Sequence, residues 1–426
     1  MRARSLALSR LGTVGGVGGI VMAAFLAGCA GDRSTPEPRP LVFSRETTWF
    51  AGPTYTDGSL DYESVLLERA RTAGWSEENE GVRPLSEALD ALAKGDEPRW
   101  FELARKAATA PVWLMCDMQP RWTLVRWKKD DLDYTGPLRR GLTRRMHEHA
   151  AAGDDDGALL AADTAVRLSR RRLTPCGAIA LAESARPEAE QIAELVAATR
   201  LPKPLPAGRL LACVDAVPEL GIEAVLQELA LAERILMTCG FDRARAEAWK
   251  EPGEALSPEV PDVVQIPHIA AALRAVDLNP HFRALQRDYD ELDAALLAPG
   301  APVEERLRNA CALLERWGVE GRPLTASEAA AFDQPSPPYA DVIEQLFREE
   351  RGLNARISRG AIHAWLASVA KRDAALAELA ALAGAPERND SLLGRPLKTR
   401  MRDDGSVEVE GDVMQLAVRV APWREE

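Results

Sequence analysis

Five histidines, six cysteines and several acidic clusters are the residues of this sequence that could bind a metal or carry out catalysis. His147 and His149 lie two residues apart, and on a helix this spacing points their rings about 200° away from each other. Metal-binding helices instead place two histidines four residues apart, so that both imidazoles face one ion. We therefore interpret His147 and His149 as an exposed or capping pair rather than as metal ligands.

Two acidic clusters could suggest a bound cation. Asp154-Asp155-Asp156 is not followed by the alternating oxygen ligands and closing glutamate of an EF-hand loop. An acidic residue just before a helix accepts hydrogen bonds from the first N–H groups of that helix, so an N-cap is the better interpretation. Asp288, Asp290, Glu291 and Asp293 are interpreted as a solvated helix face. The sequence predicts no metal ion.

The cysteines are widely spaced and form no pattern of a metal or redox site. They are Cys29, Cys116, Cys176, Cys213, Cys239 and Cys311, without a CxxC pair. We interpret those after Cys29 as small buried helix residues. One disulfide in an oxidising compartment is the alternative, and the sequence does not identify the pair. Neither a nucleophile elbow nor a Gly-rich phosphate loop is visible, so no cofactor and no catalytic residue are predicted.

One stretch combines aromatic and basic side chains in a way that suits ligand binding. Trp113, Arg121, Trp122, Arg126 and Trp127 lie within 15 residues of one another. Aromatic rings flanked by arginine can stack on bases, sugars or lipid headgroups. The alternative is a packed connector whose tryptophans fill gaps between helices. The acidic residues that follow weaken any anionic-ligand interpretation.

The first 28 residues are typical of a secretory signal peptide. Three arginines precede an apolar run, which ends in Leu26-Ala27-Gly28-Cys29. This ending resembles the lipobox of bacterial lipoproteins, and the resemblance implies cleavage before Cys29 and lipid attached to that residue. An uncleaved membrane anchor is the alternative, but the run from Val14 to Ala27 is shorter than the ~20 residues that a spanning helix needs. We expect an exported protein held at the outer membrane or at the periplasmic face of the inner membrane.

The net charge of the chain limits the classes of molecule that it can bind. The whole chain carries a formal charge of −12, and because residues 1–28 hold three arginines and no acid, the remainder carries −15. Nucleic-acid binding needs a basic face, so the sequence argues against it. Wide contact with anionic lipid is also disfavoured, and membrane attachment would then depend on Cys29.

Helical periodicity dominates the rest of the chain. A proline-rich linker over residues 29–45 leads to a helical domain over residues 46–385, with a possible subdomain junction at the proline-rich residues 251–267. Near the end of this domain, two separate helices are expected at residues 340–350 and 356–383. Another helix is expected to begin at Pro187, since proline suits the first helical turn.

One helical pair carries a family resemblance. Small residues at Ala158, Ala162 and Ala165 follow the turn around Gly153, and this pattern resembles one tetratricopeptide-type hairpin. We find no second copy at a fixed period, so a regular array is not supported. The predicted fold is therefore mainly α, with irregularly stacked helical hairpins in a TPR-like or α-solenoid-like arrangement.

After residue 385 the period changes to that of β-strands, and residues 386–426 are predicted to form a small antiparallel β-meander. Asp-Gly between two alternating runs favours a hairpin. The segment resembles a degenerate C-terminal segment of major pseudopilins, through Asp390, Gly394, Pro396, Leu397 and Asp404-Gly405. Ser391 stands where that family usually has proline, and its metal-binding acidic tail is missing. The resemblance therefore transfers no binding site.

The helical body and this tail together resemble a group of uncharacterised exported helical lipoproteins that is abundant in planctomycetes, through residues 150–173, 175–185 and 390–405. The resemblance implies fold and export only. We expect a lipid-anchored protein that binds or scaffolds other proteins of the envelope. An envelope hydrolase or ligand-binding protein with a cleft near Trp113–Trp127 is one alternative, and an accessory component of a secretion or pilus system is another.

Overall fold

The computed structural model describes most of the chain between residues 41 and 411, and every structural statement concerns these residues. They are residues 41–49, 52–55, 58–61, 64–65, 68, 71–72, 76, 81–110, 113–114, 135–170, 173–174, 178–218, 222–248, 267–321, 339–403 and 406–411.

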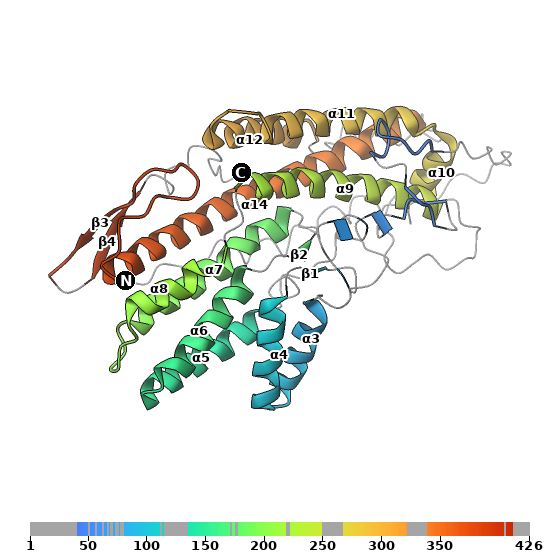
Figure 1. Ribbon diagram of the computed structural model, residues 1–426. Helices are drawn as coiled ribbons and strands as arrows, with labels where there is room; N and C mark the ends of the chain where they lie inside the picture. Colours follow the sequence, from blue (N-terminus) through green and yellow to red (C-terminus); the bar gives the residue numbers. More distant parts are fainter. Residues whose placement is uncertain are drawn as a thin grey trace.

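The described chain is mainly helical, with a small antiparallel sheet near its C-terminal end, which confirms the predicted fold class (Figure 1). The helices are α3 (Val82–Ala93), α4 (Glu97–Thr109), α5 (Gly136–Ala152), α6 (Asp155–Arg170), α7 (Ala178–Ala198), α8 (Ala207–Asp215), α9 (Ile222–Ala248), α10 (Pro267–Ala275), α11 (Asn279–Leu296), α12 (Val303–Glu320) and α14 (Tyr339–Leu382). The strands are β1 (Trp113–Leu114), β2 (Leu173–Thr174), β3 (Lys398–Met401) and β4 (Val407–Glu410).

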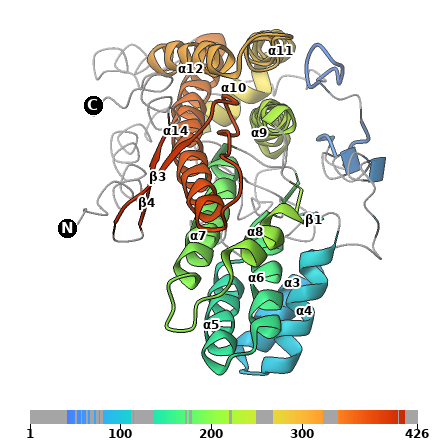
Figure 2. The ribbon, with the colours of Figure 1, turned by 60° about the vertical axis from the view of Figure 1, so that its left-hand side comes forward.

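Helix α14 packs against α7, α8, α9, α10 and α12 (Figures 1 and 2). It has 44 residues, which makes it roughly 66 Å long. Its buried apolar residues from Val342 to Ala370 belong to one hydrophobic core, and Leu376, Leu379 and Ala380 near its end belong to another. The prediction of two separate helices here was wrong. Gly352 in the middle of α14 costs only about 1 kcal/mol of helix propensity, and packing on both sides outweighs that cost.

The first core consists of two clusters of buried side chains. One is shared by α3, α4, α5 and α6, and the other by α5, α6, α7, α8 and the end of α14. Helices α5 and α6 form the predicted antiparallel hairpin, and Gly153 between them has the left-handed φ of 80° that glycine adopts without a steric penalty. Ala158, Ala161, Ala162 and Ala165 of α6 are completely buried. These small side chains let the neighbouring helices approach closely.

Helix α7 begins nine residues before the predicted start at Pro187, so that proline lies inside the helix. An interior proline removes one helical hydrogen bond and usually ends or kinks a helix. Here α7 packs along α14 and also against α6, and Arg139 of α5 donates to the Pro187 carbonyl oxygen at 3.2 Å. Tertiary packing thus overrides the local rule.

The second core contains buried residues of α9, α10, α11, α12 and of α14 as far as Ala370. The rings of Phe241 and Phe347 stack at 3.7 Å between centroids, and Phe282 meets both edge-on. The segment 41–49 also packs here, since Leu41 is buried in this core and the Val42 N–H donates to Asn279 at 2.9 Å. The end of the predicted linker, from residue 41 onward, therefore packs on the second core.

The C-terminal segment is attached to the helices through a loop built around Asp390. This carboxylate is buried and accepts hydrogen bonds from the N–H groups of Leu392 and Arg395, each at 3.1 Å. Gly394 has a φ of 65°, which suits glycine at this turn. Strands β3 and β4 then pair antiparallel, as the Asp-Gly turn predicts, with Lys398 opposite Glu410. Residues 412–426 of the predicted meander lie outside the described residues.

Candidate functional site

Most of the site residues singled out from the sequence lie outside the described residues. These are Cys29, Arg121, Trp122, Arg126 and Trp127. Trp113 is described through its backbone, as one of the two residues of β1, and it pairs in parallel with Leu173 of β2. The structure therefore brings this part of the connector beside the end of α6, which the local sequence pattern did not predict.

The two histidines of the His147-Glu148-His149 motif face different hollows on α5. His147 lines a groove between α5 and α7, whereas His149 lines a separate hollow with Glu97 and Arg145. The rings therefore point apart, as their spacing predicts. Of the two hollows, the α5–α7 groove has the stronger marks of a binding site.

The α5–α7 groove is a hollow of about 550 Å³ whose lining residues are mostly charged or polar, although they expose more carbon than nitrogen or oxygen to it. Helix α5 contributes seven lining residues and α7 contributes three: Arg139, Arg140, Thr143, Arg144, His147, Glu148, Ala151, Glu190, Gln191 and Glu194. The two helices run parallel, because Arg139 contacts Pro187 at one end and Lys203, just after α7, donates to the Ala151 carbonyl oxygen at the other. One end of the groove is therefore formed by the start of α5 and the middle of α7, and the other by the C-terminal ends of both helices.

Two nitrogens of this groove lack the hydrogen-bond partners that buried polar atoms normally have. They are Nε2 of His147 and Nε2 of Gln191, and both are inaccessible to solvent within the described structure. The whole Gln191 residue is only 2% exposed. An unsatisfied buried donor costs about 1–3 kcal/mol, so native proteins retain few of them. A ligand that displaced the side chains covering these atoms and offered them an acceptor would recover that free energy.

Charge changes sign along the α5–α7 groove. At the end that begins with Arg139, three arginines of α5 face the single carboxylate of Glu190, which lies 3.6 Å from Arg139. Farther along, Glu148 and Glu194 provide two carboxylates. Arg140 and Glu194 form no hydrogen bond or ion pair with any other described residue. The groove therefore presents an unpaired cation near one end and an unpaired anion toward the other.

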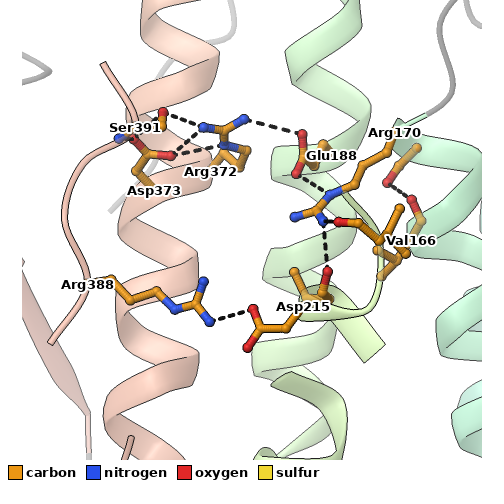
Figure 3. A network of polar contacts seen from close by, with 11 residues as sticks. Val166, Arg170, Glu188, Asp215, Arg372, Asp373, Arg388 and Ser391 are labelled. Carbon is orange, nitrogen blue, oxygen red and sulfur yellow. Dashed lines mark hydrogen bonds and ion pairs between the residues drawn. The ribbon is translucent and has the colours of Figure 1, made fainter. Parts of the chain in front are cut away.

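A second cavity, of about 390 Å³, lies beside a buried ionic network (Figure 3). Glu188 of α7 accepts from Arg170 of α6 at 2.7 Å and lies 3.5 Å from Arg372 of α14. Arg372 in turn donates to Asp373 at 2.8 Å, and Asp373 accepts from both the N–H and the hydroxyl of Ser391. The network thus connects α6, α7 and α14 with the Asp390 loop.

This ionic network stabilises the fold and does not form a ligand-binding site. None of the described side chains that line its cavity has a buried nitrogen or oxygen without a partner. Arg170 also donates to the carbonyl oxygens of Val214 and Val217, which fixes the end of α8. Because its hydrogen bonds are already satisfied, a ligand entering this cavity would have to break them. The contrast with the α5–α7 groove makes the groove the better candidate site.

The acidic turn between α5 and α6 confirms the predicted N-cap. Asp154 accepts a hydrogen bond from the Gly157 N–H at 3.0 Å and contacts Nδ1 of His149 at 2.7 Å. The hydrogen bond from the Gly157 N–H and, to a smaller extent, the contact with His149 lower the pKa of the Asp154 carboxyl below its usual value. The carboxylate is thereby held ionised at the positive end of the α6 dipole.

Replacing Asp154 by alanine should lower the free energy of unfolding, because the first turn of α6 loses its N-cap. Asp155→Ala is the matched control, because Asp155 is in the first turn of the same helix and makes no cap in the described structure. Urea denaturation of both variants checks this prediction. Equal losses for the two variants would show that Asp154 acts only through its charge.

The acidic face of α11 is solvated at Asp290 and Glu291, as predicted, but not at Asp288 and Asp293, whose side chains are each only 25% exposed. Asp288 is bonded to Arg351 of α14, and Asp293 is bonded at 2.7 Å to Arg234 of α9, which is buried and lies under the ring of Trp49. Burial raises the pKa of both carboxyls, against the opposing effect of their arginine partners. These acids are therefore contacts between helices. Their arginines lie at least 50 residues away in the sequence, so no local pattern identifies them.

Thiol reactivity should differ sharply between the two described free cysteines, Cys213 and Cys311. Burial raises the pKa of the Cys311 thiol to about 12, and the residue is only 2% exposed. Only the thiolate reacts readily with maleimides. We expect Cys311 to remain unlabelled at pH 7.5 in the folded protein and to react after denaturation, while half-buried Cys213 reacts first. Mass spectrometry of labelled peptides measures both, and rapid labelling of Cys311 would contradict its burial.

Sequence reasoning missed Arg140, Gln191 and Glu194 as members of a site. A partial indication was present, since Arg140, Arg144, His147 and Ala151 recur at helical spacing along one face of α5. The opposite wall could not be found this way, because it comes from α7.

Within the described residues, no group of three or more histidine, cysteine or acidic side chains is arranged to hold a metal ion. No helix in the described part of the chain is both long enough and apolar enough to cross a membrane. No protein-family model matches the chain, and no curated protein or solved structure matches it either.

Proposed function

We propose that this chain is a lipid-anchored helical interaction module of the cell envelope, and that the α5–α7 groove is its binding surface. The observation that carries the proposal is the pair of buried nitrogens without partners, on His147 and Gln191, in an open groove. Buried polar groups in folded proteins are nearly always satisfied, so exceptions at a groove favour a site that a partner completes.

Anchoring is supported by the sequence. Leu26-Ala27-Gly28-Cys29 resembles a lipobox, and prolines in the following segment would space the folded body from the lipid. The first described segment, 41–49, joins the second core, whereas the α5–α7 groove belongs to helices at the other end of the molecule (Figures 1 and 2). This arrangement keeps the groove away from the point where the anchor enters, so a partner could reach it.

Binding suits the groove better than catalysis does. Thr143 is the only hydroxyl among its described lining residues, and it makes no hydrogen bond with His147. An activated nucleophile requires such a bond to a general base. The remaining groups are charges and an amide, which position and orient a partner rather than attack it.

Crosslinking mass spectrometry in intact cells tests the proposed function. The native chain is compared with a Cys29→Ser chain, which cannot carry the lipid. We expect the native chain to give reproducible links from α5 and α7 to a small set of envelope proteins, and the unanchored chain to lose them. An anchored chain without such links, or with links spread evenly over its whole surface, would contradict the proposal.

A further inference from the structure

The length, hydrogen-bonding groups and charges of the α5–α7 groove define the kind of partner segment it could hold. From Arg140 to Ala151 the α5 wall covers eleven helical steps, which is roughly 16 Å at the rise of an α-helix. An extended chain advances about 3.3 Å per residue. The groove therefore matches about five residues of extended peptide.

The unpartnered nitrogens favour a peptide backbone over an apolar surface. Nε2 of Gln191 is an amide donor and needs an acceptor such as a backbone carbonyl oxygen. Nε2 of His147 either donates or accepts, depending on its tautomer, and a peptide group offers both an N–H and a C=O. An apolar helix seated in the groove would leave both nitrogens unsatisfied, at a cost of about 1–3 kcal/mol each.

The charges of the groove add a requirement on the side chains of the bound segment. An acidic side chain would pair with Arg140 and Arg144 near one end, and a basic one with Glu148 and Glu194 farther along. Arg144 and Glu148 already lie 3.7 Å apart, but both are well exposed, and such surface pairs contribute at most about 1 kcal/mol. A simple anion such as a phosphate group would instead meet the carboxylates of the α7 wall, so like charge disfavours it.

We propose that the α5–α7 groove binds an extended peptide segment of about five residues that carries an acidic side chain at one end and a basic side chain at the other. This inference rests on the proposed function and names the chemistry of the partner. The backbone of the segment satisfies Gln191 and His147 once the side chains that cover their Nε2 atoms move aside, and its two charges match the two ends of the groove.

An array of immobilised peptides with blocked termini tests this inference, using the purified full-length lipoprotein in detergent. Every peptide has two end positions separated by three neutral residues. In the mixed-charge set the ends are one aspartate and one lysine, and in the two like-charge sets they are two aspartates or two lysines. We expect the mixed-charge peptides to retain at least ten times more protein than either like-charge set. Equal retention of the three sets, or no retention at all, would overturn the inference.

A charge reversal separates recognition from general damage to the fold. In Glu194→Lys the acidic part of the groove loses one carboxylate and gains a cation, so preference should move toward the peptides with two aspartates. Glu305→Lys makes the same change on the exposed face of α12, outside the groove, and should leave the preference unchanged. An unchanged preference in Glu194→Lys would overturn the inference. If the cellular links map to the groove while the array fails, the proposed function stands and only the peptide chemistry is wrong.

Discussion

Replacing Asp373 by asparagine is expected to lower the free energy of unfolding by about 3–5 kcal/mol, the range found when one partner of a buried ion pair is removed. Asp373 is 3% exposed and holds both Arg372 and the Asp390 loop, through the backbone N–H and hydroxyl of Ser391 (Figure 3). Losing its charge leaves Glu188, at 3.5 Å, as a more distant carboxylate beside the buried guanidinium of Arg372, which also donates to the Ser391 hydroxyl.

Asp215→Asn is the matched control for this prediction. Asp215 pairs with Arg388 of the same tail at 2.5 Å, but its side chain is 48% exposed, so solvent screens the pair. We expect a loss of at most about 1 kcal/mol for Asp215→Asn. Chemical denaturation of the two variants beside the native chain gives the comparison. Similar small losses for both would show that the buried network does not attach the tail.

Gly352→Ala is expected to destabilise the fold by about 2–3 kcal/mol, near the upper end of the usual cost of overpacking a core. The Cβ atom of alanine at this position would lie 2.5 Å from the Cα atom of Gly321, at the end of α12. Both groups belong to backbones, so α12 and α14 would have to separate. The better helix propensity of alanine, about 1 kcal/mol, offsets only part of this cost.

Gly360→Ala provides the control within the same helix. A Cβ atom at Gly360 meets no other atom within 4 Å, so alanine there should raise stability by up to about 1 kcal/mol. Thermal unfolding followed by circular dichroism reports both changes. If the Gly352→Ala variant also gained stability, the close crossing of α12 and α14 at Gly321 and Gly352 would be wrong.

The parts of the fold that the sequence predicts are those set by local patterns. The α5–α6 hairpin follows from helical spacing and from Gly153, and the β3–β4 pair follows from alternation around an Asp-Gly turn. The continuity of α14 and the early start of α7 were missed. In both cases a glycine or a proline marks a local boundary, and packing between helices overrides it.

The candidate site could be predicted only in part, because its two walls come from helices that are separate in the sequence. His147 was noticed for its spacing to His149, yet its importance comes from Gln191, which tertiary packing brings to the same groove. The same reason applies to Asp293 and Arg234, which meet across α11 and α9. Side-chain types are visible in a sequence, but which of them share a surface depends on long-range contacts.

Site-specific photo-crosslinking in intact cells tests the central claim most directly. A photoreactive amino acid is placed at Thr143, inside the α5–α7 groove, and in a second strain at Arg308, on the exposed face of α12. The account predicts a discrete adduct with an envelope protein from position 143, absent from position 308 and lost when Cys29 is replaced by serine. Adducts from position 308 alone, or none from position 143 in the anchored chain, would contradict the groove as the binding surface.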